Sequence, residues 1–153
     1  MIIDPQQVPT QKTSTYPELF KSRVEGRIKQ RLGDVAGLKS LGVNLVKLQP
    51  GSSSALRHFH SHEDEFIYVL EGEITLVTNA GSRILTPGMA AGFPAGEADA
   101  HHLINHSENL AIYLEVGNRH PEDEATYPDD DLIAKTNEDG RYFTRKNGIP
   151  YEG

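Results

Sequence analysis

Short segments that mix apolar and polar residues recur at intervals of about ten from residue 23 to residue 116, as in antiparallel sandwiches and barrels. Six of them have the composition of β-strands: 43–48, 66–70, 73–78, 83–85, 101–105 and 110–116. Residues that favour turns separate these segments: Pro50-Gly51, Glu71-Gly72, Asn79-Ala80-Gly81, Pro87-Gly88 and Ser107-Glu108-Asn109. The pattern predicts an all-β fold.

The two ends of the chain lack this alternation. Residues 1–22 are polar and proline-containing, which predicts an arm that wraps the domain or a neighbouring subunit. The segment 21–33 is the nearest approach to a helix, but Gly26 and its β-branched neighbours favour a strand or irregular structure. Residues 117–153 are polar and acidic, and their last part, 141–151, predicts a small hairpin or an extended tail. We therefore expect an N-terminal arm (1–22), a β-barrel (23–116) and a C-terminal extension (117–153).

Composition narrows the class of protein. A chain of 153 residues with 37% apolar residues is the size of one domain. Its 15 basic and 22 acidic residues give a net charge of −7, which argues against nucleic acid as a partner. The sequence contains neither an apolar run of about 18 residues nor a signal-peptide pattern, so we expect no membrane association and a cytoplasmic location. The absence of cysteine leaves imidazole and carboxylate groups as the available metal ligands.

Histidines and carboxylates gather in the segment "RHFHSHEDEF", residues 57–66. In an extended strand, His58, His60 and His62 share one face, and Glu65 follows just before an apolar run. Five of the seven histidines lie in this segment and in "HHLIN", residues 101–105, so isolated surface histidines are a poor explanation. Imidazole with carboxylate is the ligand set of zinc, iron, manganese, copper or nickel. The pattern predicts a metal site.

Two motifs carry a resemblance to the cupin superfamily. Residues 50–72, "PGSSSALRHFHSHEDEFIYVLEG", resemble its first motif, and residues 88–105, "GMAAGFPAGEADAHHLIN", resemble its second. The matching positions are Gly51, His58, His60, Glu65 and Gly72 in the first motif and Gly88, Pro94, Gly96, His101 and Asn105 in the second. The gap from Gly51 to His58 is one residue longer than usual, and two extra residues separate Gly96 from His101.

The resemblance implies a single cupin barrel, that is, a double-stranded β-helix or jelly roll, with irregular arms at both ends. It also implies one divalent metal ion (Fe, Mn, Zn or Ni) held by His58, His60, Glu65 and His101. Two alternatives remain open: His62 in place of His58, and His102 in place of His101. The spacings from His60 to Glu65 and from Glu65 to Gly72 favour His58, and the spacing to Asn105 favours His101.

Such a centre predicts a small-molecule enzyme acting on an oxygen-rich substrate, with dioxygenase-like chemistry or Lewis-acid isomerase or lyase chemistry. Glu65 is the candidate catalytic residue, acting as a base if it can leave the metal. The alternative is a non-catalytic cupin that binds or senses a small molecule. A homodimer is expected, because open sheet edges need cover and cupins are often dimers.

Overall fold

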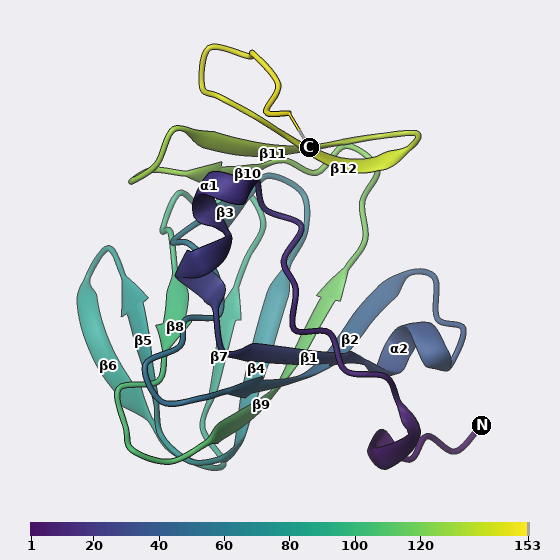
Figure 1. Ribbon diagram of the computed structural model, residues 1–153, viewed down its shortest axis with the longest axis vertical. Helices are drawn as coiled ribbons and strands as arrows, with labels where there is room; N and C mark the ends of the chain where they lie inside the picture. Colours follow the sequence, from purple (N-terminus) through teal and green to yellow (C-terminus); the bar gives the residue numbers. More distant parts are fainter. Residues whose placement is uncertain (153) are drawn as a thin grey trace.

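The computed structural model describes residues 1–152, and its strands form three antiparallel sheets (Figure 1). The five-stranded sheet has the order β1 (Arg27–Arg31), β2 (Leu41–Leu48), β9 (Ala111–Asn118), β4 (Glu65–Glu71), β7 (Ala90–Phe93). The three-stranded sheet has the order β6 (Gly81–Leu85), β5 (Ile74–Thr78), β8 (His102–Ile104). The four-stranded sheet has the order β12 (Gly140–Thr144), β11 (Leu132–Asn137), β10 (Ala125–Tyr127), β3 (Phe59–His60). The predicted all-β fold is confirmed.

Apolar side chains from the five-stranded and three-stranded sheets form the core of the barrel. Alternate residues of one strand point to the same face, so Val46 and Leu48 of β2 face inward while Lys47 faces outward. They pack in one cluster with Tyr113 of β9 and with Ile74 and Leu103 of the other sheet. These side chains form one apolar core between the two sheets.

The N-terminal arm packs on its own domain. It contains three short helices, η1 (Pro5–Gln7), α1 (Glu18–Lys21) and η2 (Ser22–Val24), while a fourth, α2 (Leu32–Val35), follows β1. Val8, Tyr16 and Phe20 of the arm are buried. Gln11 pairs with Lys29 of β1 through two backbone hydrogen bonds of 2.8 and 2.9 Å. The arm therefore adds to the edge of the five-stranded sheet.

The four-stranded sheet lies across one end of the barrel as a separate layer (Figure 1). Its strand β3 comes from the histidine segment, and β10, β11 and β12 come from the C-terminal extension. A second core forms between this sheet and the arm, and its members include Tyr16, Leu56, Tyr127, Leu132 and Phe143. The layer fixes the histidine segment against the chain's last third.

The six predicted strands all occur, with ends that differ by up to two residues. Within segment 21–33, the strand interpretation is right for β1. Within 141–151, Thr144 pairs with Pro150, and the Tyr151 amide donates to the Phe143 carbonyl at 3.0 Å, which makes a small hairpin. The structure adds strands β3, β7, β10, β11 and β12, so the C-terminal extension is more regular than an arm. Over residues 1–152, no helix is long and apolar enough to cross a membrane.

Candidate metal centre

The histidine segment and the second histidine pair meet through the backbone. His58 precedes β3 and His101 precedes β8, and the two residues form an isolated antiparallel bridge. The His58 amide donates to the His101 carbonyl at 3.1 Å, and the His101 amide donates to the His58 carbonyl at 2.9 Å. His60 lies in β3, and Glu65 is the first residue of β4. Two segments about forty residues apart in sequence are thereby held side by side.

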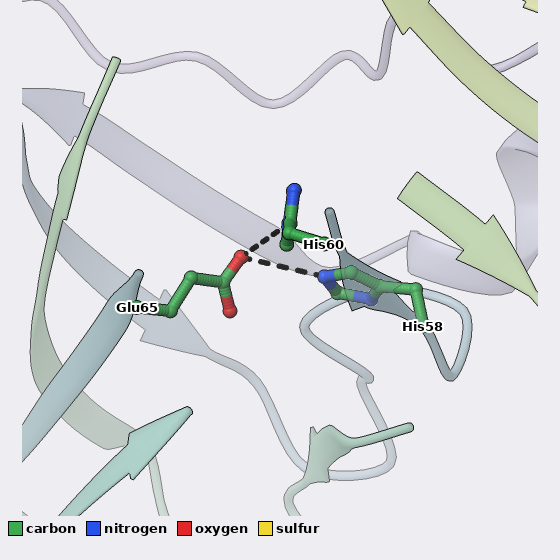
Figure 2. A group of neighbouring side chains, drawn as sticks. All are labelled: His58, His60 and Glu65. Carbon is green, nitrogen blue, oxygen red and sulfur yellow. Dashed lines mark hydrogen bonds and ion pairs between the residues drawn. The ribbon is translucent and has the colours of Figure 1, made fainter. Parts of the chain in front are cut away.

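The imidazoles of His58, His60 and His101 converge on the Glu65 carboxylate. The Glu65 Oε1 atom lies 2.6 Å from His60 Nε2 and 3.4 Å from His58 Nε2. Dashed lines mark both contacts in Figure 2. The other oxygen, Oε2, lies 2.7 Å from His101 Nε2. One ligand atom from each of His58, His60 and Glu65 lies within 4.8 Å of the others, so these three residues are close enough to hold one ion.

The outer ring nitrogens of two histidines have protein partners. His58 Nδ1 donates to the Leu56 carbonyl at 2.7 Å, and His60 Nδ1 donates to Asp123 Oδ2 at the same distance. A donating Nδ1 directs Nε2 toward the centre as the metal-binding atom, the arrangement found around metal-ligating histidines. His101 differs, because its buried Nδ1 has no hydrogen-bond partner within residues 1–152. Its ring is positioned instead by stacking on Phe93, with 3.5 Å between ring centroids.

Asp123 is a buried carboxylate behind His60. Besides its bond to His60, it accepts hydrogen bonds from the amides of His62 and Glu63 at 3.0 Å each. The Arg141 guanidinium donates to it at 3.1 Å. Burial raises the pKa of this carboxyl, but the hydrogen bond and charge of His60 and the amide donors outweigh that effect and hold the pKa well below its usual range. Asp123 is therefore a fixed negative charge that holds the orientation of His60.

The charges in the centre favour an ionised carboxylate. Burial favours the neutral form of Glu65, but hydrogen bonds to His101, His58 and His60 hold its pKa well below the usual range. Burial also opposes the charged form of His60, but hydrogen bonds to Asp123 and Glu65 outweigh it and raise the pKa to about 10. Burial lowers the pKa of His101, against the opposing effect of Glu65. A divalent cation would take the place of the proton on His60 Nε2.

The donor set fits a divalent transition metal. Imidazole nitrogens and a carboxylate are suitable ligands for Fe, Mn, Zn or Ni, and two imidazoles are already oriented by their outer hydrogen bonds. The four residues line a cavity of about 260 Å³. That volume lies just under the range common for small-molecule pockets, about 300–1,000 Å³. The centre therefore opens onto space for a small ligand.

The alternative ligands lie elsewhere. His62 is exposed, its Nδ1 lies 2.7 Å from Ser61 Oγ, and its ring stacks on His120 with 4.5 Å between centroids. His102 points away from His101, as expected for adjacent strand residues, and its Nδ1 bonds to the Ala55 carbonyl at 3.0 Å. Neither residue contacts Glu65 among the contacts within residues 1–152.

Sequence reasoning missed three neighbours of the centre: Asp123, Phe93 and Tyr127. Asp123 lies in an acidic run that resembles a solvated surface segment, and Phe93 follows a run of alanine and glycine. Tyr127 lies 5.4 Å from His58 between ring centroids. Their spacing in the sequence gives no signal of a site. The folding of the C-terminal extension and of β7 brings them to the centre.

Comparison with known proteins identifies the family. A family model described as the cupin domain matches residues 44–117. The crystal structure of a sugar phosphate isomerase from a cupin superfamily, from Silicibacter pomeroyi, superposes with a TM-score of 0.95 and 40% identity. That alignment covers 100% of this chain and 98% of the other. This chain belongs to the cupin superfamily.

Two further solved structures extend the comparison. A putative sugar phosphate isomerase from Acidithiobacillus ferrooxidans is 28% identical, with a TM-score of 0.77 over 88% of this cupin and 85% of the other chain. The polyketide cyclase RemF from Streptomyces resistomycificus is 21% identical, with a TM-score of 0.66 over 80% and 82% of the two chains, which shows a shared fold alone. Among proteins with curated descriptions, none matches the sequence of this cupin.

Proposed function

We propose that this cupin is a metal-dependent isomerase of sugar phosphates. The observation that carries the proposal is the convergence of three imidazoles on one carboxylate at the wall of a cavity. The similarity, across the whole chain, to a protein described as a sugar phosphate isomerase supports the choice of reaction. A sugar phosphate is also an oxygen-rich small molecule, the class of substrate expected from the sequence.

In this proposal His58, His60, Glu65 and His101 hold one divalent ion. When bound, the ion supplies Lewis acidity that polarises a substrate carbonyl oxygen. Two of the imidazoles already have their outer nitrogens held, by Leu56 and Asp123, which directs each Nε2 toward the centre. Such preorganisation avoids the cost of ordering flexible side chains on binding.

Glu65 is the candidate base. The imidazoles hold the pKa of Glu65 well below its usual range, so the group is an ionised but weak base and depends on polarisation of the substrate carbonyl to take the proton from the neighbouring carbon. Returning that proton to the neighbouring carbon, while a hydroxyl proton moves to the former carbonyl oxygen, exchanges aldose for ketose without a net change in composition. Of its two oxygens, Oε1 lies beside His58 and His60 and Oε2 lies beside His101, so a carboxylate that bound the ion through one oxygen would keep the other for the proton.

The proposal is tested by solvent isotope exchange. Purified protein loaded with Fe, Mn, Zn or Ni is incubated in deuterated water with aldose and ketose phosphates and followed by NMR. We expect interconversion and deuterium incorporation at the carbon next to the carbonyl, both lost on chelation and restored by the metal. Oxygen uptake with a cleaved product would instead identify a dioxygenase. Saturable binding without turnover would identify the binding or sensory cupin.

A further inference from the structure

We infer that β1 and the N-terminal arm form a subsite for a phosphate monoester, across the cavity from the metal centre. The inference rests on the proposed function, because it assigns the place where the substrate's phosphate binds. Arg27, Lys29 and Arg31 of β1 line the same cavity as Glu65. They give the cavity a cationic wall facing the four candidate ligands.

Strand register places these three cations on the inward face. Arg27 and Lys29 pair with Leu48 and Val46 of β2, which are fully buried in the barrel core. Residues i, i+2 and i+4 of a strand share a face, so Arg31 points the same way. Ile28, between the first two, points outward with its partner Lys47.

The two arginines keep donors available for a ligand. Arg27 donates one terminal nitrogen to the Ser54 carbonyl at 2.7 Å, and Arg31 donates its Nε to Gln11 Oε1 at 2.7 Å. Within residues 1–152, the remaining guanidinium nitrogens of both have no hydrogen-bond partner. A guanidinium held at one nitrogen presents the others in a fixed fork, which matches the oxygens of a phosphate.

The charge of the cavity differs from the charge of the molecule. The chain carries a net charge of −7. The cavity nevertheless has four cations, the three of β1 and Arg141, against two carboxylates, Glu65 and Glu115. Glu115 lies 3.6 Å from Lys29, and Glu65 belongs to the proposed metal centre. The β1 side of the cavity therefore retains an excess of positive charge that favours an anion.

The arm completes the subsite with hydroxyl groups. Its pairing with β1 at Gln11 brings Thr13, Ser14 and Thr15 to the cavity lining beside the cations. Hydroxyls donate hydrogen bonds to phosphate oxygens without adding charge. The arm therefore combines a structural role at the sheet edge with a binding role.

The strand order separates the two ends of the cavity. Strands β2 and β9 lie between β1 and β4, so the cations and Glu65 are three strand spacings apart, about 14 Å along the sheet. The length of arginine and lysine side chains shortens this span within the cavity. The arrangement suits a substrate with its carbonyl at one end and its phosphate at the other.

Isothermal titration of the metal-loaded protein tests the subsite, with inorganic phosphate, glucose 6-phosphate, glucuronate and glucose as probes. We expect Arg27→Gln and Arg31→Gln each to weaken phosphate and glucose 6-phosphate binding at least about tenfold, the loss expected for a charge-assisted hydrogen bond. Arg31 is exposed, so its variant should fold even if Arg27→Gln does not. Lys47→Gln removes a cation from the outward face of the same sheet and should change nothing.

The outcomes separate the subsite from the reaction. Phosphate binding that persists in His60→Ala and falls in the arginine variants supports the subsite, even if no sugar phosphate is turned over and the isomerase proposal fails. The subsite is refuted if wild-type protein binds no phosphate, or if both arginine variants bind it like wild type. Tighter binding of glucuronate than of glucose 6-phosphate would refute a phosphate site in favour of a sugar-acid site.

Discussion

Each ring nitrogen of His60 contacts a carboxylate, and the two carboxylates differ in burial. Glu65 lies at the centre and is partly accessible, whereas Asp123 is fully buried and is satisfied by two backbone amides and Arg141. A carboxylate behind a metal-ligating histidine raises the basicity of the imidazole and fixes its tautomer. In the proposed metal centre, Asp123 would therefore orient His60 and raise the basicity of its imidazole.

Asp123→Asn should weaken metal binding about 10- to 100-fold, because the amide cannot supply the negative charge that holds His60. The measurement is a metal affinity from competition with a chelator of known strength. Glu124→Gln, one residue away, exposed and outside every cluster of possible metal ligands in residues 1–152, is the matched control and should bind metal like wild type. Unchanged affinity in Asp123→Asn would show that the buried carboxylate serves the fold alone.

His60→Ala should remove most of the metal while leaving the barrel folded, because apolar burial elsewhere provides the main stabilisation. Elemental analysis of protein purified without a chelating tag measures the loss, and circular dichroism checks the fold. His106→Ala is the control, since His106 is exposed and lies outside every cluster of possible metal ligands in residues 1–152. If His60→Ala retains a full equivalent of metal, the proposed ligand set is wrong.

At the scale of elements, the tight turn between β4 and β5 depends on Gly72. Its φ is +76°, and a Cβ built there would lie 2.5 Å from the Leu110 carbonyl oxygen. Gly37 has nearly the same φ, +78°, but a Cβ there would meet nothing within 4 Å. Substitutions at these two glycines can therefore distinguish the free-energy cost of the backbone conformation from the cost of the steric contact.

Gly37→Ala should lower the free energy of unfolding by about 1–2 kcal/mol, the cost of a left-handed conformation for a residue with a Cβ. Gly72→Ala should cost clearly more, because the neighbouring backbone must also move. Chemical denaturation of both variants measures the difference. Equal losses would mean that the β4–β5 turn relaxes freely around the added methyl group.

How well the sequence predicts a strand depends on which part of the chain buries that strand. Segments 43–48, 66–70 and 110–116 face a core on one side, so their alternation reveals them. The segments that form β10, β11 and β12 have polar sequences without a clear strand pattern. They form strands through pairing in the sheet with β3 and through a core shared with the distant arm. The same holds for the site: His58, His60, Glu65 and His101 are predicted from two motifs and lie together, whereas Asp123 arrives through a long-range contact that no local pattern encodes.

At the scale of the whole molecule, the outward face of the five-stranded sheet exposes a row of large apolar residues on β4. Phe66, Tyr68 and Leu70 are 45%, 40% and 48% exposed, and they alternate with the buried Ile67 and Val69. Contiguous exposed apolar surface commonly marks a contact between subunits. A second copy of the same face would be self-complementary, as a two-fold dimer requires. The homodimer stays a prediction.

Sedimentation of the wild-type protein should therefore give twice the chain mass of 16.9 kDa. Leu70→Glu should shift the protein toward the monomer, because it places a charge in the proposed contact. Ile84→Glu, at a position of the three-stranded sheet that is 56% exposed, should leave the dimer intact. A monomeric wild type, or dissociation caused by Ile84→Glu alone, would exclude this face.

The bond between His60 and Asp123 joins residues 63 positions apart in the sequence, and the arm reaches the same region from the opposite end of the chain. Contacts of such separation form late, after the entropy of closing a long loop has been overcome. During synthesis, the histidines would therefore leave the ribosome before Asp123 could hold His60 in position to bind an ion. If the centre binds an ion as proposed, firm binding should follow the folding of the C-terminal extension.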